Sequence, residues 1–389
     1  MTQITLGEPV LIDQAPVGLR EWGPWQFPHL ERLADGRIHL EFHVEADSVT
    51  AYGLPTRHAL SADDGRTWEA VEARDARGGL LLPNGDRLLP VQLQSRPRAE
   101  VTLPEPVLVQ EDAPTRITHI YSAADLAEEL SGWRFLRRRS GEENWIEETA
   151  SVRMPGEIRI VREEMYAFWP SFHHGRSQLA PDGSIWEAIH TKRIVDGVVQ
   201  PANNILYLRS VDAGYSWDVL SEILYQPDRE ADPHADRRDG FTEPEFNFMP
   251  DGSVLCLLRT HDLLGVGPSY WSRSLDGGQS WSDPRVFDDR GVWPRMLTLE
   301  NGITLASYGR PGLFVRATAD PAGLEWDKRV VVVQPAERRQ DTCSYSALLA
   351  LDENTALLAY SDFNYPDAQG QKRKSILVRT VTASRYAVG

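Results

Sequence analysis

Several side chains that can exchange a proton or bind an anion stand at the ends of strand-like runs. Glu243 and Glu245 open one run and Arg259 ends the next, so a hairpin would bring all three to one end of a sheet. Arg310 follows another run, and Tyr345 begins the last hairpin. A phenol becomes a useful nucleophile when a carboxylate accepts its proton, and guanidinium groups bind carboxylates through charged hydrogen bonds. Proton transfer and recognition of an acidic group are the chemistry that these residue types allow.

Each of these residues also has a structural interpretation. Tyr345 would be a strand aromatic with a satisfied hydroxyl, and Glu243 with Arg259 would be an ion pair across a hairpin. Glu245 competes with Glu243 for any role, because residues two apart on a strand point the same way.

A second polar group, His173-His174-Gly-Arg176, stands at the start of another hairpin. Such a pair of histidines serves either as a polar turn or as a source of acid and base groups. Spacings typical of zinc sites, paired cysteines and glycine-rich phosphate loops are missing from the sequence. The sequence therefore predicts no metal and no cofactor.

The elements that must position these residues are hairpins that recur along the chain. Each has an apolar run, a tight turn and a second apolar run, and Asx-Gly between β-rich runs is a strong hairpin signal. The turns are Asp35-Gly36, Asn84-Gly85, Asp182-Gly183, Asp251-Gly252, Asn301-Gly302 and Glu353-Asn354. Their spacing suits four-stranded units except between the second and third, where residues 95–169 are interpreted as an elaboration of the second unit. A β-sandwich inserted there is the alternative.

A repeated motif, Ser-x-Asp-x-Gly-x-(Ser/Thr)-Trp, indicates that the chain is built from repeats. It occurs at Ser61–Trp68, Ser210–Trp217 and Ser274–Trp281, with a degraded copy from Thr318 to Trp326. The Asp can bind its own turn backbone, the Gly permits positive φ, and the Trp can fold back under the hairpin. This motif resembles the Asp-box (BNR repeat). Together with the hairpins it predicts an all-β fold, a single six-bladed β-propeller over residues 1–389.

Fold and motif resemble the sialidase (neuraminidase) superfamily, and the resemblance implies roles for the polar residues. Tyr345, in Tyr-Ser-Ala-Leu-Leu, falls on the nucleophile of that family, and Glu243 is implied as its base by its spacing to Arg259. Arg259 and Arg310 match arginines that hold the substrate carboxylate. Asp47, in the loop after the first hairpin, matches the acid/base residue. The joint occurrence of these residues at such spacings favours a real site over separate structural roles.

The sequence departs from the family at its first arginine. The family's Phe-Arg-Ile-Pro stands here as Trp25-Gln26-Phe27-Pro28, so a neutral amide replaces a guanidinium. The lost charged hydrogen bonds would be worth about 1.5–3 kcal/mol each. The candidates for supplying the missing charge are Arg20, His29, Arg176 and Arg295. If none does, the substrate is not a sialic acid.

The resulting prediction is a retaining exo-glycoside hydrolase that acts on a terminal acidic sugar of a glycan. One alternative is a lyase acting on uronic-acid glycans, in which a histidine such as His173 or His174 removes the C5 proton. Others are an exo-glycosidase for another sugar and a non-catalytic carbohydrate-binding propeller.

The amino-acid composition narrows the classes of molecule that the protein is expected to bind. The net charge of −16 argues against nucleic acid or an anionic membrane as the main partner. Neither a secretory signal nor a run of about 18 apolar residues is visible, and Cys256 and Cys343 are expected to be packed free thiols. A cytoplasmic location is the default expectation, although a secreted protein without its signal would look the same. The sequence leaves the oligomeric state open.

Overall fold

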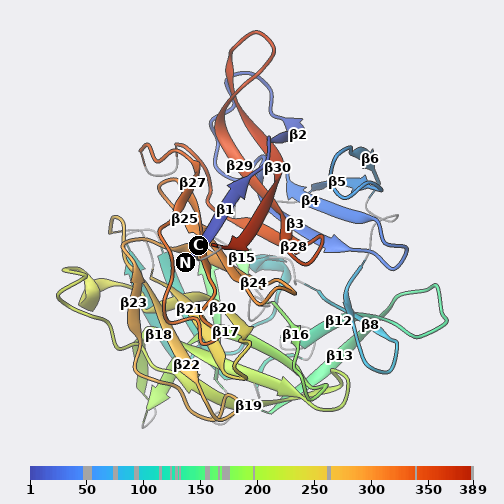
Figure 1. Ribbon diagram of the computed structural model, residues 1–389. Coiled ribbons are helices and arrows are strands. Elements are labelled where there is room, and N and C mark those ends of the chain that lie inside the picture. The colour runs from blue at the N-terminus through green and yellow to red at the C-terminus, as the bar shows by residue number, and fades with distance from the viewer. Residues whose placement is uncertain are drawn as a thin grey trace.

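The computed structural model describes the chain as strands joined by tight turns (Figure 1). It describes residues 1–46, 55–72, 78–91, 96–113, 116–122, 125–127, 130, 133–153, 158–164, 167–168, 176–195, 198–260, 264–337 and 340–386. The helices assigned within these ranges are the short 3-10 turns η2 (Arg98–Glu100) and η4 (Ala235–Arg237). The prediction of an all-β fold is therefore confirmed.

Three sheets have four antiparallel strands in sequence order. The first contains β3 (Gln26–Arg32), β4 (Ile38–His43), β5 (Thr56–Ser61) and β6 (Glu69–Val71). The second contains β20 (Phe241–Phe248), β21 (Val254–Thr260), β22 (Ser269–Ser274) and β23 (Arg285–Asp288). The third contains β24 (Val292–Thr298), β25 (Thr304–Gly309), β26 (Leu313–Thr318) and β27 (Val330–Val333).

An eight-stranded sheet combines two antiparallel halves. One half contains β7 (Leu80–Leu81), β8 (Arg87–Pro90), β12 (Trp133–Arg138) and β13 (Ile146–Arg153). The other contains β16 (Gln178–Leu179), β17 (Ile185–Val195), β18 (Val198–Ser210) and β19 (Ser216–Ile223). The halves meet where β13 pairs with β19 in parallel.

The two ends of the chain meet in one sheet, which closes the fold into a ring (Figure 1). The C-terminal part supplies β28 (Ser346–Ala350), β29 (Thr355–Pro366) and β30 (Lys372–Arg385), and the N-terminal part supplies β1 (Thr2–Leu6) and β2 (Val10–Gln14). Both N-terminal strands pair with β30. Residues at opposite ends of the sequence therefore come to the same part of the molecule.

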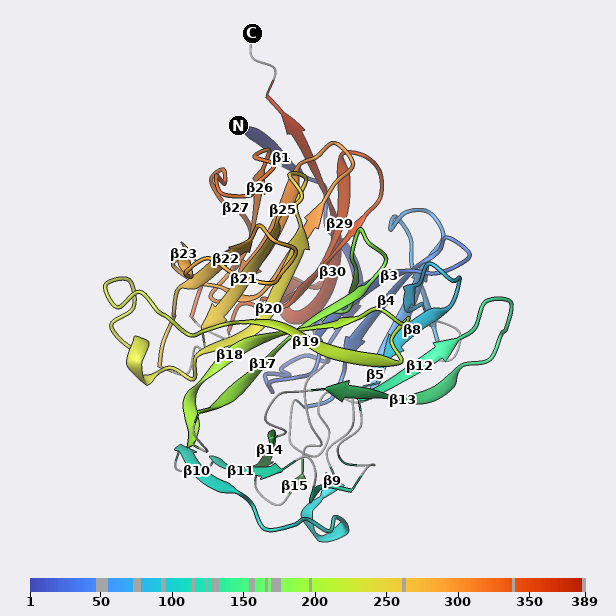
Figure 2. The same cartoon turned by 90° about the horizontal axis from the view of Figure 1, so that it is seen from below.

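A further sheet lies apart from the ring, below it in Figure 2. Its strands run in the order β10-β11-β14-β15-β9. They are β9 (Arg96–Pro97), β10 (Leu108–Ala113), β11 (Arg116–Ser122), β14 (Ile158–Glu164) and β15 (Ala167–Phe168). Residues 95–169 thus contribute both to this sheet and, through β12 and β13, to the sheet of β7 and β8.

Each predicted tight turn joins two antiparallel strands. In the first hairpin Gly36 has φ +87°, a conformation that a residue with a Cβ adopts at a cost. Turn chemistry of this kind acts over a few residues, which is why the sequence predicts it well.

The apolar core lies between neighbouring sheets, where side chains from both inner faces interdigitate. Leu305 and Val315 pack with Leu358 and Leu377 in one such layer, and several similar layers follow around the ring. Because the apolar side chains face the neighbouring sheets, the axis of the ring remains for polar ones. Cys256 and Cys343 are buried and free, as predicted.

The repeated turns act as local structural units. Asp63 accepts hydrogen bonds from the backbone of Arg66 and Thr67, at 3.1 and 2.8 Å, and from the Thr67 hydroxyl. The Trp68 indole donates back to the Gly65 carbonyl at 3.0 Å. These hydrogen bonds, led by that of the Thr67 side chain, lower the pKa of Asp63 to about 2. The aspartates of the repeated turns are thus engaged by their own turns.

No helix among the described residues has both the length and the apolar character needed to cross a membrane.

Candidate functional site

The first strands of the three four-stranded sheets, β3, β20 and β24, begin with the same unusual backbone conformation. Phe27, Glu243 and Trp293 each have a positive φ, of 56°, 46° and 26°, and each precedes a proline. Strand register shifts at each place, as at a β-bulge. Bulky residues rarely adopt positive φ, and such strain gathers at functional sites. The bulges turn these three side chains out of the normal strand alternation.

Tyr345, Glu243 and Arg259 form one compact group. The Tyr345 hydroxyl donates a short hydrogen bond to Oε1 of Glu243, and Arg259 forms an ion pair with Oε2 of the same carboxylate. Nη1 of Arg259 also donates to the Tyr345 oxygen at 3.2 Å. The phenol oxygen therefore has a base on one side and a cation on the other, which is the arrangement needed to withdraw its proton and stabilise the phenolate.

Aromatic rings and a second arginine hold the phenol in place. Phe27 and Trp293 pack edge-on against Tyr345, with ring centroids 4.7 and 5.0 Å away. The Arg310 guanidinium lies 5.5 Å from the Tyr345 ring centroid, and its Nη2 donates to the Cys343 carbonyl at 2.8 Å. The sequence-based candidates Tyr345, Glu243, Arg259 and Arg310 thus come together in space.

The surroundings shift the pKa values of Glu243 and Tyr345 in opposite directions. Burial tends to raise the pKa of Glu243, but the charge of Arg259 and the Tyr345 hydrogen bond outweigh it and hold that pKa below its usual value. Burial, followed by the negative charge of Glu243, raises the pKa of Tyr345 well above its usual value. At neutral pH the resting state is therefore a carboxylate accepting from a neutral phenol.

Glu245 occupies a separate group, although it lies only two residues from Glu243. Its carboxylate is fully buried and forms ion pairs with Nη1 of Arg176, at 3.0 Å, and Nη1 of Arg295, at 3.1 Å. The backbone N–H of Met296 donates to it as well, at 3.1 Å. Three neighbours therefore share this carboxylate.

Gln26, the position of the family's first arginine, is fully buried beside Lys374. With the amide oriented so that both of its ends are satisfied, Oε1 accepts from Nζ of Lys374 at 3.0 Å and from the Gly23 N–H at 3.1 Å. Lys374 also donates to the carbonyls of Glu21 and Pro24. All three ammonium protons are thus bound by protein oxygens, so this cation organises the loop rather than facing a ligand.

His29, another candidate for the missing charge, is an exposed residue of β3. Desolvation by the crowded protein groups around it, together with the cations Arg295 and Arg176, outweighs Glu31 and lowers the pKa of His29 to about 4. Its imidazole is therefore neutral at neutral pH and supplies no charge. Two other candidates, Arg295 and Arg176, form ion pairs with Glu245, and the Arg176 side chain is 41% exposed.

Four buried polar atoms belong to residues at or next to the strand ends that carry Phe27, Glu243 and Trp293. Nε1 of Trp25, Nδ1 of His43, Oγ1 of Thr242 and Nε1 of Trp293 are buried without a hydrogen-bond partner among the described residues. Buried polar atoms normally have partners, so such a cluster is where a polar ligand or water gains hydrogen bonds. Of these residues, Trp293 precedes a proline, as Phe27 and Glu243 do, and this recurring pattern is visible in the sequence.

Three predicted residues, Asp47, His173 and His174, lie outside the described residues. The predicted acid/base role of Asp47 and the predicted roles of the two histidines stay predictions.

Comparisons with known proteins establish the fold. No protein-family model matches the chain, and no curated protein does. Among solved structures, a protein of unknown function from Dyadobacter fermentans has a TM-score of 0.65 at 18% identity, covering 98% of this chain and 99% of that one. An alpha-L-arabinanase from Penicillium chrysogenum, complexed with arabinobiose, has a TM-score of 0.51 at 15% identity, covering 96% and 98%. The NanB sialidase from Streptococcus pneumoniae has a TM-score of 0.48 at 12% identity, covering 96% and 70%.

These similarities show a β-propeller and, at such low identity, the fold alone.

Proposed function

We propose that the protein is a retaining exo-glycoside hydrolase of the sialidase type, acting on a terminal acidic sugar. The single observation that carries the proposal is the hydrogen bond from the Tyr345 hydroxyl to Glu243, with Arg259 within 3.2 Å of the same oxygen. A phenol held by a carboxylate and a guanidinium is poised to lose its proton as it attacks. The propeller fold of the structural neighbours agrees with this activity.

In the same proposal the propeller has six blades. The two halves of the eight-stranded sheet count as separate blades, because each is an antiparallel unit and the strand pairing between them is the parallel pairing of β13 with β19. The repeated turns are then Asp-boxes at the outer ends of blades, and residues 95–169 elaborate the second blade. One ring-shaped domain spans residues 1–389.

The first step is attack of the Tyr345 oxygen on the anomeric carbon while Glu243 takes the phenolic proton. The bond to the leaving oxygen breaks, and an acid protonates that oxygen; Asp47 is the proposed acid. Water, deprotonated by the same residue, then attacks the anomeric carbon, the bond from that carbon to the Tyr345 oxygen breaks, and the proton on Glu243 returns to the phenolate. Two displacements at one carbon retain its configuration.

A tyrosine suits a sugar that carries a carboxylate on its anomeric carbon, because a carboxylate nucleophile would be repelled. Arg310 and Arg259 are the proposed partners of that acidic group, with Arg295 and Arg176 as further positive charge nearby. Trp25, His43, Thr242 and Trp293 would donate or accept the remaining hydrogen bonds of the sugar.

A second candidate is an exo-glycosidase for a sugar other than sialic acid. The observation that favours it is the contact between Gln26 and Lys374, because the protons of the Lys374 ammonium group are already bound by protein oxygens. A substrate whose recognition needs only two arginines would fit this site without an arginine at position 26.

The test is a panel of fluorogenic glycosides of sialic acids, uronic acids and neutral pentoses, with Tyr345→Phe as matched control. The proposal expects release from an acidic glycoside, retention of configuration in the NMR spectrum of the first product, and loss of activity in the variant. Labelling of Tyr345 by a fluorinated substrate analogue, detected by mass spectrometry, would locate the nucleophile. Activity on neutral pentosides alone would support the second candidate, and an unsaturated product would show elimination. Full activity of Tyr345→Phe would contradict the mechanism.

A further inference from the structure

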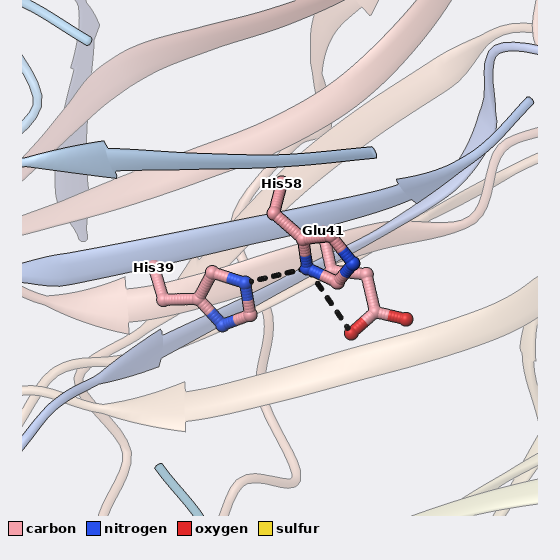
Figure 3. Close-up of side chains that lie close together, drawn as sticks. All are labelled: His39, Glu41 and His58. Atoms are coloured by element: carbon pink, nitrogen blue, oxygen red, sulfur yellow. Dashed lines mark hydrogen bonds and ion pairs between the residues drawn. The ribbon is translucent and has the colours of Figure 1, made fainter. Parts of the chain in front are cut away.

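Three side chains of metal-ligating types lie together on the sheet of β3 to β6 (Figure 3). They are His39 and Glu41 on β4 and His58 on β5. One ligand atom from each lies within 4.8 Å of the other two. Nε2 of His39 is 3.0 Å from Nδ1 of His58, which is 4.0 Å from Oε2 of Glu41.

Sheet geometry explains why these residues meet. His39 and Glu41 are two apart on one strand, so their side chains share a face. In the neighbouring strand His58 lies directly opposite Glu41, and directly opposed side chains on one face are near neighbours. The usual sequence signature for zinc requires close spacing in the chain, whereas here the third residue comes from the next strand.

We propose that His39, Glu41 and His58 form a binding site for a divalent transition-metal ion, with Zn²⁺ as the best match. Zinc takes imidazole nitrogens and carboxylate oxygens at about 2.0–2.2 Å in a tetrahedron, which sets its ligands about 3.3 Å apart. The separations of 3.0 and 4.0 Å lie on either side of that value. The Glu41 carboxylate, which is partly exposed, would have to move toward the imidazoles by about 1 Å to close the site around an ion, and a fourth position would be left for water.

The groups behind the ligands have the arrangement that metal sites require. Nδ1 of His39 is 2.9 Å from a carboxylate oxygen of Glu31. The N–H groups of Gly78 and Gly79 donate to that carboxylate at 3.1 and 2.9 Å. A histidine that binds metal commonly donates its other N–H to a carboxylate, which fixes the ring and its tautomer. Glu31 therefore leaves Nε2 of His39 with its lone pair toward His58.

The hydrogen bonds of His58 would let it bind a metal ion by moving a proton from one ring nitrogen to the other, without losing that proton. Its Nε2 lies 2.9 Å from Oγ1 of Thr56. Without metal, Nδ1–H of His58 donates to His39 and Nε2 accepts from Thr56. With metal on Nδ1, the proton moves to Nε2 and is donated to the Thr56 oxygen. Both imidazoles then stay neutral and present lone pairs to the ion.

The site is partly open to solvent. His39 is 1% exposed and His58 9%, whereas the Glu41 side chain is 37% exposed. A pocket of about 210 Å³ touches His58 and is lined also by Thr56, Arg57, Ala70, Val71 and Glu72. An ion therefore has a route to the ligands, and Glu72 places a carboxylate in that pocket.

The experiment uses the full chain, stripped with a chelator and then titrated with ZnCl₂ in a calorimeter. Wild type is expected to bind one zinc ion per chain. His58→Gln and Glu41→Gln should each weaken binding by at least about 100-fold, and Glu31→Gln by about 10- to 100-fold through loss of the group behind His39. His234→Gln, which changes an exposed histidine just before η4, is the matched control and should bind as wild type does. Addition of Co²⁺ should produce visible absorption bands of a tetrahedral site in wild type and not in Glu41→Gln.

The proposal is overturned if wild type fails to bind zinc one-to-one at micromolar concentration, or if Glu41→Gln binds as tightly as wild type. Circular dichroism establishes which variants fold. Should His58→Gln fail to fold, Glu41→Gln decides the result, because its side chain is the most exposed of the three. Binding that survives in Glu41→Gln but is lost in His234→Gln would assign the zinc to the surface and likewise overturn the proposal.

Discussion

Glu243 and Glu245 lie two residues apart on β20, yet their surroundings differ in kind. The Glu243 carboxylate, with 16% of its side chain exposed, contacts a phenol and one guanidinium. The Glu245 carboxylate has no exposed surface and contacts two guanidinium groups and a backbone N–H. The first can accept a proton from its neighbour, whereas the second is held by donors that do not release theirs. Equal residue types on one strand therefore serve different purposes.

The bulge between Thr242 and Glu245 creates this difference. In a regular strand the two glutamates would point the same way. The register shift and the positive φ of Glu243 turn its side chain to Tyr345 instead. The comparison predicts that changes at Glu243 alter catalysis and changes at Glu245 alter stability.

The largest expected effect comes from the Glu243 group. Glu243→Gln removes the proposed base and Tyr345→Phe removes the proposed nucleophile, and each should lower kcat/KM by about 10²- to 10⁴-fold. Steady-state kinetics on the best acidic glycoside measures the loss, and thermal unfolding checks that both variants are folded. Wild-type rates in Glu243→Gln would show that the proton goes elsewhere and would remove the distinction between the two glutamates.

Glu245→Gln should act mainly on stability. It leaves Arg295 and Arg176 beside each other without their shared carboxylate, and breaking a buried pair costs about 3–5 kcal/mol. Because Arg176 is 41% exposed and regains water, we expect about 2–3 kcal/mol, measured by urea unfolding. The folded variant should keep kcat within about tenfold of wild type, on the scale of 1.4 kcal/mol per factor of ten. A fall in kcat as large as that of Glu243→Gln, with unchanged stability, would reverse the two roles.

The pH dependence of activity should depend on Arg259. Its charge helps to hold the pKa of Glu243 below the usual value, so the wild-type carboxylate stays ionised above about pH 4.5 and activity falls only below that. In Arg259→Met burial acts with less opposition, the pKa rises, and the acid limb of kcat/KM should move up by at least about 1 pH unit, or 1.4 kcal/mol. An acid limb that stays in place would mean that another group controls it.

The smallest expected effect concerns Arg176. If its exposed guanidinium adds to recognition of an acidic sugar, Arg176→Gln should raise KM about 3- to 10-fold with kcat unchanged, since a charged hydrogen bond contributes about 1.5 kcal/mol or less at an exposed site. Arg66→Gln, at an exposed position of the first repeated turn, is the control. Unchanged KM together with lower stability would assign Arg176 to Glu245 alone.

Much of the fold could be predicted because its signals are local. Asp35-Gly36 and the Ser61–Trp68 turn each make their defining hydrogen bonds within a few residues. The grouping of Tyr345, Glu243 and Arg259 followed from the resemblance and from strand ends meeting at the axis. The bulges were harder to predict, since proline marks their position and not the direction of the side chain before it.

The sequence by itself determined the all-β class, the hairpins and the repeated turns, because each depends on residues close together in the chain. The tertiary structure alone decided which partners the distant polar residues acquired. Pairing of β1 and β2 with β30 closes the ring and sets Lys374 beside Gln26, and neighbouring sheets bring Arg176 and Arg295 onto Glu245. These contacts join residues up to 383 positions apart, 385 − 2 for Thr2 and Arg385, and form only when every sheet has packed on the next.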